Sequence, residues 1–89
     1  MYGRDPSALW RRVGADVVVL SSAANDPLTL VGLSAGLWRL LSMPTDLGSI
    51  RDELEQEGLL VRGTGSRELE RILTLLVLLN VVRNEAVPA

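Results

Sequence analysis

The chain has 89 residues, 47% of them hydrophobic, with nine Arg, no Lys, eleven acidic residues, no Cys, no His and a net charge of −2. Without Cys or His there is no thiol nucleophile, no imidazole acid or base, no disulfide and no zinc site of the usual kind. A chain this short predicts one small domain without a deep catalytic cleft, so we expect no enzyme, no catalytic residues, no metal and no cofactor.

The charge balance disfavours one further class of protein, and the apolar pattern excludes another. An acidic chain lacks the excess of basic residues that binding to nucleic acid requires, so we expect no nucleic-acid partner. The longest apolar stretch, 72–82, is about half of the ~20 residues that cross a bilayer, and Asn80 interrupts it. No apolar signal segment precedes the domain, so we expect a cytoplasmic protein without a membrane span.

The first part of the chain predicts three β-strands. Residues 8–13 and 17–20 flank the turn signal Gly14-Ala15-Asp16 and form a hairpin, in which the β-branched run after the turn is the strongest strand signal. A connector rich in turn-forming residues, 21–27, precedes the short apolar segment 28–31. We interpret this segment as the third strand.

The second part of the chain predicts three helices. Apolar residues recur at helical spacing over 34–43, until Pro44 stops them. A second helix begins after Thr45 or Asp46, which can cap it, and ends at Gly58. Its acidic residues lie on the solvent-exposed face of the helix: Asp52, Glu53, Glu55 and Glu57.

The third helix runs from Ser66 to about Arg83 in this interpretation. The order of elements predicts an α+β fold, with a three-stranded antiparallel sheet followed by three helices. The domain extends over 8–84, between an N-terminal tail, 1–7, and a C-terminal tail, 85–89.

The third helix is apolar over most of its circumference. One stripe along it contains Leu69, Ile72, Leu73, Leu76 and Asn80. A second stripe contains Leu75, Leu78, Leu79 and Val82. Two short helices and a small sheet have little surface to cover both stripes. Either this is simply the most buried helix, covered by the strands and by 59–61, or part of it lines a groove or a homodimer face.

Several segments together carry a resemblance to a known family. They are the Trp10-x-x-Val13 start, the run Asp16-Val-Val-Val-Leu20 and the run Leu30-Val-Gly-Leu-Ser-Ala-Gly-Leu-Trp-Arg-Leu-Leu41, followed by 44–50 and Leu54. On these residues the sequence resembles the PqqD-like family, small domains that recognise leader peptides in the biosynthesis of ribosomally made, post-translationally modified peptides. The resemblance covers about residues 9–83.

The resemblance implies a winged-helix-like domain without catalytic activity, which binds the leader of a precursor peptide. The leader adds as a strand to the edge of the third strand, beside the third helix, and is presented to a modifying enzyme or leader peptidase of the same pathway. The edge residues are then Leu28, Thr29, Leu30 and Val31. The apolar floor is formed by Leu75, Leu78, Leu79 and Val82. Arg67 and Arg71, near the start of the helix, pair with acidic residues of the leader.

The same residues also have ordinary structural interpretations. Leu28 and Leu30 point to one side of their strand, so at least one of them belongs to the core. Arg67 and Arg71 are solvated helix residues that pair with neighbouring glutamates at ~0.3–0.5 kcal/mol.

Two other functions stay open. The first is a homodimeric interaction module that buries the exposed stripe of the third helix. The second is a winged-helix DNA-binding domain, which is disfavoured because the third helix is largely Leu and Val where basic residues would be needed. Trp10 and Trp38 are interpreted as core anchors and not as platforms for a ligand.

Overall fold

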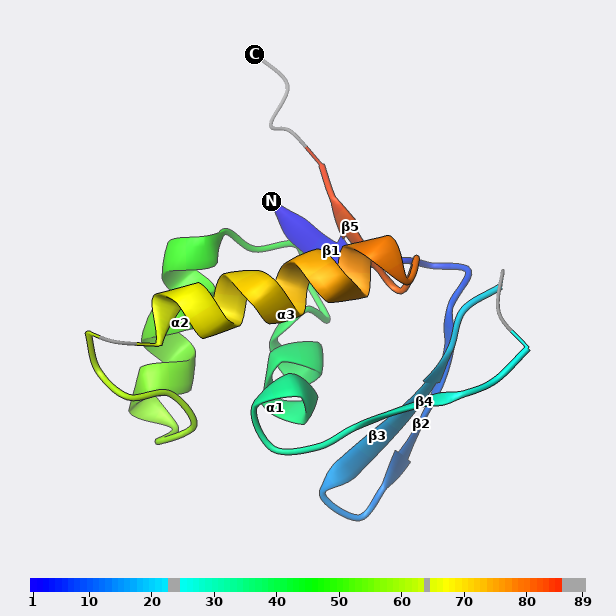
Figure 1. Cartoon of the computed structure of the whole chain (residues 1–89), viewed down its shortest axis with the longest axis horizontal. Helices are drawn as coiled ribbons and strands as arrows, with labels where there is room; N and C mark the ends of the chain where they lie inside the picture. Colours follow the sequence, from blue (N-terminus) through cyan, green and yellow to red (C-terminus); the bar gives the residue numbers. More distant parts are fainter. Residues whose placement is uncertain (23–24, 64, 86–89) are drawn as a thin grey trace.

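The computed structural model describes residues 1–22, 25–63 and 65–85, and it has the predicted α+β fold. A three-stranded antiparallel sheet is followed by three helices, and a small second sheet joins the two ends of the described chain (Figure 1). Helix α3 crosses the molecule from the side of α2 toward the three-stranded sheet, with α1 between them (Figure 1).

The three predicted strands are present as β2 (Leu9–Val13), β3 (Asp16–Leu20) and β4 (Leu28–Leu30), in the order β2-β3-β4. Gly14 takes a φ of 63° in the turn between β2 and β3, a conformation that glycine adopts without steric cost. The register pairs Val17 with Leu30, and both side chains are buried. The face of the sheet that carries them therefore packs on the helices.

The three predicted helices are α1 (Leu33–Leu40), α2 (Leu47–Gln56) and α3 (Ser66–Leu78). Helix α1 ends before the predicted residue 43, in a turn that leads to Pro44. The prediction that Asp46 can cap α2 is confirmed, since the Ser49 N–H donates to Asp46 Oδ1 at 2.8 Å.

Hydrogen bonds from Ser49, first from its backbone N–H and then from its hydroxyl, lower the pKa of Asp46, because they stabilise the carboxylate. Gly58 follows α2 with a φ of 75°, in agreement with the prediction that it ends this helix.

Two further strands were not predicted. Strand β1 (Tyr2–Arg4) pairs antiparallel with β5 (Val82–Asn84), so the segment 1–7 contains a strand where the sequence predicted a tail. Beyond them Met1 and Glu85 exchange two backbone hydrogen bonds, each of 2.8 Å. Of the predicted C-terminal tail, residues 86–89 lie outside the described residues.

The prediction that α3 continues to about Arg83 was wrong. The helix ends at Leu78, and Asn80 takes a φ of 62°, the left-handed conformation in which Asn commonly terminates helices. The chain then turns into β5, whose backbone hydrogen-bonds with β1. Pairing between strands at opposite ends of the sequence therefore replaces the last turn of the predicted helix.

The core lies between the inner face of the sheet and the three helices. It includes Val17, Val19, Leu30, Leu37, Trp38, Leu41, Ile50, Leu54, Leu69, Leu73, Leu76, Val81 and Val82. Trp38 is fully buried, as predicted, whereas Trp10 is 48% exposed and lies edge-on to it, with ring centroids 6.1 Å apart.

Arg4 of β1 contacts both indole rings at the rim of the core. Its guanidinium lies 4.6 Å from the Trp10 ring centroid and 5.0 Å from that of Trp38, and it donates two hydrogen bonds to the Trp38 carbonyl oxygen. Partial burial lowers the pKa of Arg4, which remains protonated.

None of the helices in the described part of the chain has the length and apolar character needed to span a membrane.

Candidate functional site

Strand β4 is an edge strand with unpaired backbone groups. It pairs with β3 on one side, and none of the described strands pairs with its other side. Val31, which was predicted to belong to this strand, is already satisfied, because its N–H donates to Ser34 Oγ at 3.1 Å and its carbonyl accepts from the same hydroxyl at 2.8 Å. The edge that can accept another strand is therefore Leu28–Leu30.

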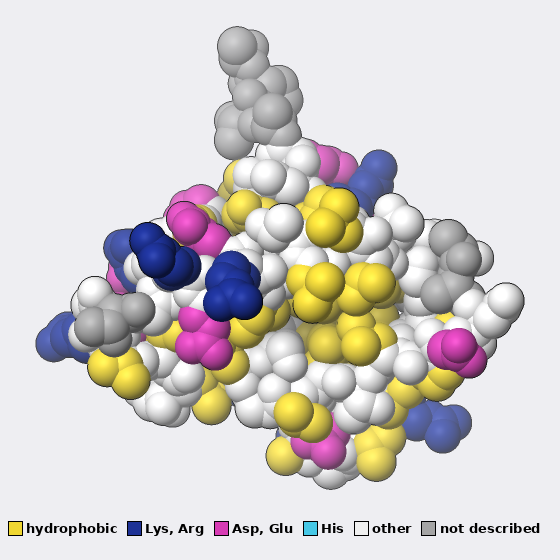
Figure 2. Space-filling view, viewed as in Figure 1, with side chains coloured by type: hydrophobic (Ala, Val, Ile, Leu, Met, Phe, Trp, Pro, Cys, Tyr) yellow, Lys and Arg dark blue, Asp and Glu magenta, His cyan; other side chains and the backbone are white. Residues whose placement is uncertain are grey.

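A cleft of about 350 Å³ separates this edge from α3. Its lining residues come from β4, from the start of α1 and from one side of α3: Leu28, Thr29, Leu30, Val31, Leu33, Ser34, Glu68, Ile72, Leu75 and Leu76. Figure 2 shows hydrophobic side chains gathered over the C-terminal half of α3 and toward β4, with basic and acidic side chains over its N-terminal half. The cleft thus joins an unpaired strand edge to an apolar helix surface.

Helical spacing explains which residues α3 presents to the cleft. Glu68, Ile72 and Leu75 are four and three residues apart, the spacing of side chains on one face of an α-helix, and Leu76 lies beside them. On this face Leu76 is buried in the core, Ile72 is half-buried and Leu75 is exposed to solvent. Glu68 is the single charged side chain among the described residues that line the cleft.

The structure separates the two predicted arginines from the strand edge. Arg67 and Arg71 line a different groove of about 420 Å³ on the outer side of α3, together with Glu70, Thr74, Leu75 and Leu78. Leu75 borders both the cleft and this outer groove. The arginines therefore lie next to the cleft, on the far side of Leu75.

The residues of the predicted apolar floor also lie in different places, and only one of them lines the cleft. Leu75 is 55% exposed and lines the cleft, whereas Leu78, 73% exposed, lines the outer groove. Leu79 is exposed at the end of α3 and lines neither. The assignment of Val82 was wrong: it is 2% exposed, because it belongs to β5 and packs in the core.

Sequence reasoning missed Glu68, Ile72 and Leu76 as cleft residues. Ile72 and Leu76 were assigned to the other stripe of α3, and Glu68 was considered as one of the glutamates that neighbour Arg67 and Arg71. Their spacing along the helix was visible in the sequence, but the side of α3 that faces β4 depends on how the helix packs.

Comparison with known proteins identifies a fold. No protein-family model and no curated protein sequence matches the chain. Among solved structures, "TbiB1 in Complex with the TbiA(beta) Leader Peptide" matches with a TM-score of 0.82 and 20% sequence identity, over 96% of this chain and 99% of TbiB1. The two chains share one fold.

Within this TbiB1-like fold, the lining of the cleft is suited to binding. It offers apolar surface, an unpaired backbone edge, the Thr29 hydroxyl and one carboxylate. Over residues 1–22, 25–63 and 65–85, no group of three or more acidic side chains is placed to hold a metal ion. An extended peptide would use the backbone edge and the apolar surface together.

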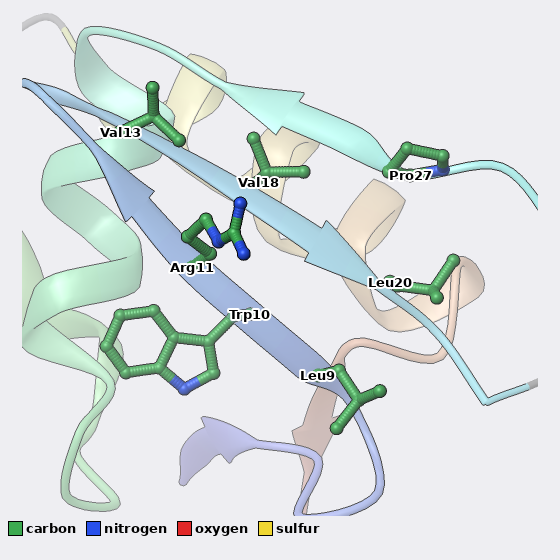
Figure 3. A pocket seen from close by; sticks show the side chains of 7 residues that line it. All are labelled: Leu9, Trp10, Arg11, Val13, Val18, Leu20 and Pro27. Carbon is green, nitrogen blue, oxygen red and sulfur yellow. The ribbon is translucent and has the colours of Figure 1, made fainter.

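The outer face of the sheet carries a second apolar surface, away from the cleft. It is a depression of about 390 Å³ with this lining: Leu9, Trp10, Arg11, Val13, Val18, Leu20 and Pro27. In Figure 3 Arg11 and Val18 lie side by side on neighbouring strands, as their pairing in the register requires. Because alternate residues of a strand point to opposite faces, this surface and the buried core face belong to the same strands.

Proposed function

We propose that this chain is a non-catalytic, cytoplasmic peptide-binding module of the PqqD-like kind. It recognises the leader of a ribosomally synthesised precursor peptide by strand addition and presents it to a modifying enzyme or leader peptidase of the same pathway. The peptide adds to β4 and lies in the cleft between β4 and α3. The similarity in fold to TbiB1, whose structure contains a leader peptide, supports this proposal.

The observation that carries the proposal is the unpaired edge of β4 beside an apolar cleft. An added strand gains main-chain hydrogen bonds from Leu28–Leu30, and its alternate side chains point toward α3. Exposed edges usually carry charges or are covered, because they promote aggregation. An uncharged edge next to exposed leucine surface fits a site that a ligand covers.

Arg67 and Arg71 have a secondary part in this proposal. They line the outer groove, and Leu75 separates them from the cleft. A leader that continues past Leu75 comes within reach of both guanidinium groups, which then pair with acidic residues of the leader. Thr29 lies in the middle of the edge and contacts the added strand directly, and Val31 follows the edge and limits the length of the added strand.

A display selection tests whether the cleft binds peptides. A random 16-residue peptide library is selected on the wild-type chain and counter-selected on Leu75→Asp, so that ligands of other apolar surfaces are removed. The best peptide is then titrated into ¹⁵N-labelled chain. We expect the amide signals of Leu28–Leu30 to shift most, with smaller changes at Val31, whose N–H is already hydrogen-bonded to Ser34.

Two results of this titration would contradict strand addition at β4. The first is a selection in which no peptide distinguishes the wild-type chain from Leu75→Asp. The second is a titration in which the amides of β2 shift while those of Leu28–Leu30 do not.

A second experiment tests the assignment to leader peptides. The N-terminal and C-terminal halves of a short peptide encoded beside the gene for this chain are synthesised separately. We expect the N-terminal half to bind and the C-terminal half, which becomes the product, not to bind. Equal binding of both halves would contradict leader recognition.

A homodimer is the second candidate, and the exposure of Leu78 outside the cleft favours it. Sedimentation velocity at several protein concentrations measures it directly. A dimer that Leu78→Asp disrupts, without loss of peptide binding, would place the dimer interface on the outer groove. Peptide binding and dimer formation can then coexist.

A further inference from the structure

Glu68 stands out within the cleft because its neighbours there are apolar or uncharged. It lies in the first turn of α3, and the next cleft residues along the helix are Ile72 and Leu75. The ion pairs of the described chain join Arg39 to Glu57, Arg51 to Asp52 and Arg83 to Glu85, and none includes Glu68. Its carboxylate is therefore available to a ligand.

The helix dipole explains why an acidic residue is stabilising at the start of α3, but it does not determine on which side of the helix that residue lies. Glu68 is in the first turn, where the dipole acts, and Glu70 is just beyond it. The two differ in what they face, since Glu68 lines the cleft beside β4 and Glu70 lines the outer groove with the arginines. A substitution of Glu70 is therefore a matched control for the same substitution of Glu68.

The spacing of the cleft residues matches that of a β-strand. Four residues of α-helix rise about 6 Å, and two residues of a strand advance about 6.6 Å. In an added strand lying along α3, one cleft-facing side chain meets Glu68 and the next cleft-facing side chain meets Ile72. The following one reaches Leu75 and Leu76. In the bound peptide, the residue opposite Glu68 is therefore two residues away from the residue that contacts Ile72.

We propose that this cleft selects peptides carrying Lys or Arg opposite Glu68, with apolar residues at the two neighbouring cleft-facing positions, opposite Ile72 and opposite Leu75 and Leu76. This inference rests on the proposed function and names the class of peptide that it recognises. A Lys or Arg side chain of the peptide donates a charge-assisted hydrogen bond to the Glu68 carboxylate. An acidic side chain there meets a like charge beside apolar surface, so the same residue also rejects wrong ligands.

The test compares peptide selections on three forms of the chain, all counter-selected on Leu75→Asp. They are the wild type, Glu68→Lys and the matched control Glu70→Lys. We expect the wild-type pool to be enriched in Lys or Arg at one position, and the Glu68→Lys pool to be enriched in Asp or Glu there. The Glu70→Lys pool should keep the wild-type preference.

Measured affinities sharpen the test. In the best wild-type peptide, replacing the selected basic residue by Glu should weaken binding about tenfold at low salt, and Glu68→Lys should recover most of that loss. Glu68→Gln should bind the basic and acidic forms with nearly equal affinity. Thermal unfolding of each variant reports separately on the helix.

Different outcomes separate the inference from the proposed function. If the wild-type and Glu68→Lys pools have the same preferences, or if Glu70→Lys changes the preference as much as Glu68→Lys does, the inference is overturned while binding in the cleft stands. If no peptide distinguishes the wild-type chain from Leu75→Asp, the proposed function itself is overturned.

Discussion

Helix α3 has two leucine faces with opposite surroundings. Leu69, Leu73 and Leu76 are buried, whereas Leu75 and Leu78 are largely exposed on the same thirteen-residue helix. The side chains are chemically alike, so their hydrophobicity does not distinguish them. Their angular position around the helix decides whether they stabilise the fold or remain available to a ligand.

This comparison shows how a small domain can reserve binding surface. An 89-residue chain has too few elements to cover every apolar side chain of α3. The sheet and the other helices cover one face, and β4 lies across a cleft from the next. The uncovered surface is therefore next to an unpaired strand edge, and together they form the candidate site.

The largest expected effect is a loss of stability when a leucine on the buried face of α3 is replaced. Leu73→Ala should lower the free energy of unfolding by about 2–5 kcal/mol, because it removes apolar contacts and leaves a cavity. The matched change on the exposed face, Leu78→Ala, should alter it by less than about 0.5 kcal/mol. Urea unfolding followed by circular dichroism measures both. Similar losses in the two variants would remove the distinction between the faces.

The next effect concerns the ligand and not the fold. Leu75→Asp should weaken peptide binding about tenfold or more, because the cleft loses an apolar contact. Its unfolding free energy should stay within about 1 kcal/mol of wild type, since the side chain is already exposed. Val61→Asp, at an exposed residue that lines neither the cleft nor the outer groove, is the control and should keep the affinity. Calorimetry with a selected peptide distinguishes the two variants.

A smaller effect is expected where α3 ends. Asn80 has a φ of 62°, so Asn80→Ala should lower the unfolding free energy by about 1 kcal/mol, because a Cβ without a compensating polar group is strained there. Asn80→Gly should be neutral or slightly stabilising. Thermal unfolding of both variants tests this. Equal stability of Asn80→Ala and wild type would show that this conformation does not terminate the helix.

The smallest effect is expected in the outer groove. Reversing both Arg67 and Arg71 to Glu should weaken binding of a selected peptide that has acidic residues beyond the cleft by about two- to fivefold at low salt. The difference should disappear near 1 M salt, where the Debye length is about 3 Å. Arg62→Glu, in the loop before α3, provides the matched control. A loss that persists at high salt would contradict an electrostatic contact.

Much of the fold could be predicted from local pattern. The strands β2, β3 and β4 and the three helices were each marked by β-branched runs, helical spacing or turn and cap residues such as Asp46 and Gly58. These signals act over a few residues, so they can be read along the sequence. The burial of Trp38 followed from the same reasoning, whereas the exposure of Trp10 did not, because it depends on where the edge strand β2 lies relative to the helices.

The candidate site was predicted less completely. The edge of β4 was expected from the resemblance to the PqqD-like family, and the exposure of Leu75 was one of two alternatives that the helical pattern left open. The separation of Arg67 and Arg71 from the cleft did not, since a few tens of degrees of rotation of α3 decide which of two adjacent stripes faces β4.

By itself the sequence determined the class of fold, the order of β2, β3, β4 and the three helices, and the abundance of apolar residues on the third helix, because these depend on local preferences and on composition. Tertiary structure alone decided where α3 ends, whether Val82 is buried, and on which side of α3 Glu68 and Glu70 lie. The pairing of β1 with β5 ends α3 early and buries Val82. Helix packing turns Glu68 toward β4 and Glu70 away from it. Each depends on contacts between residues far apart in the chain, which no local pattern encodes.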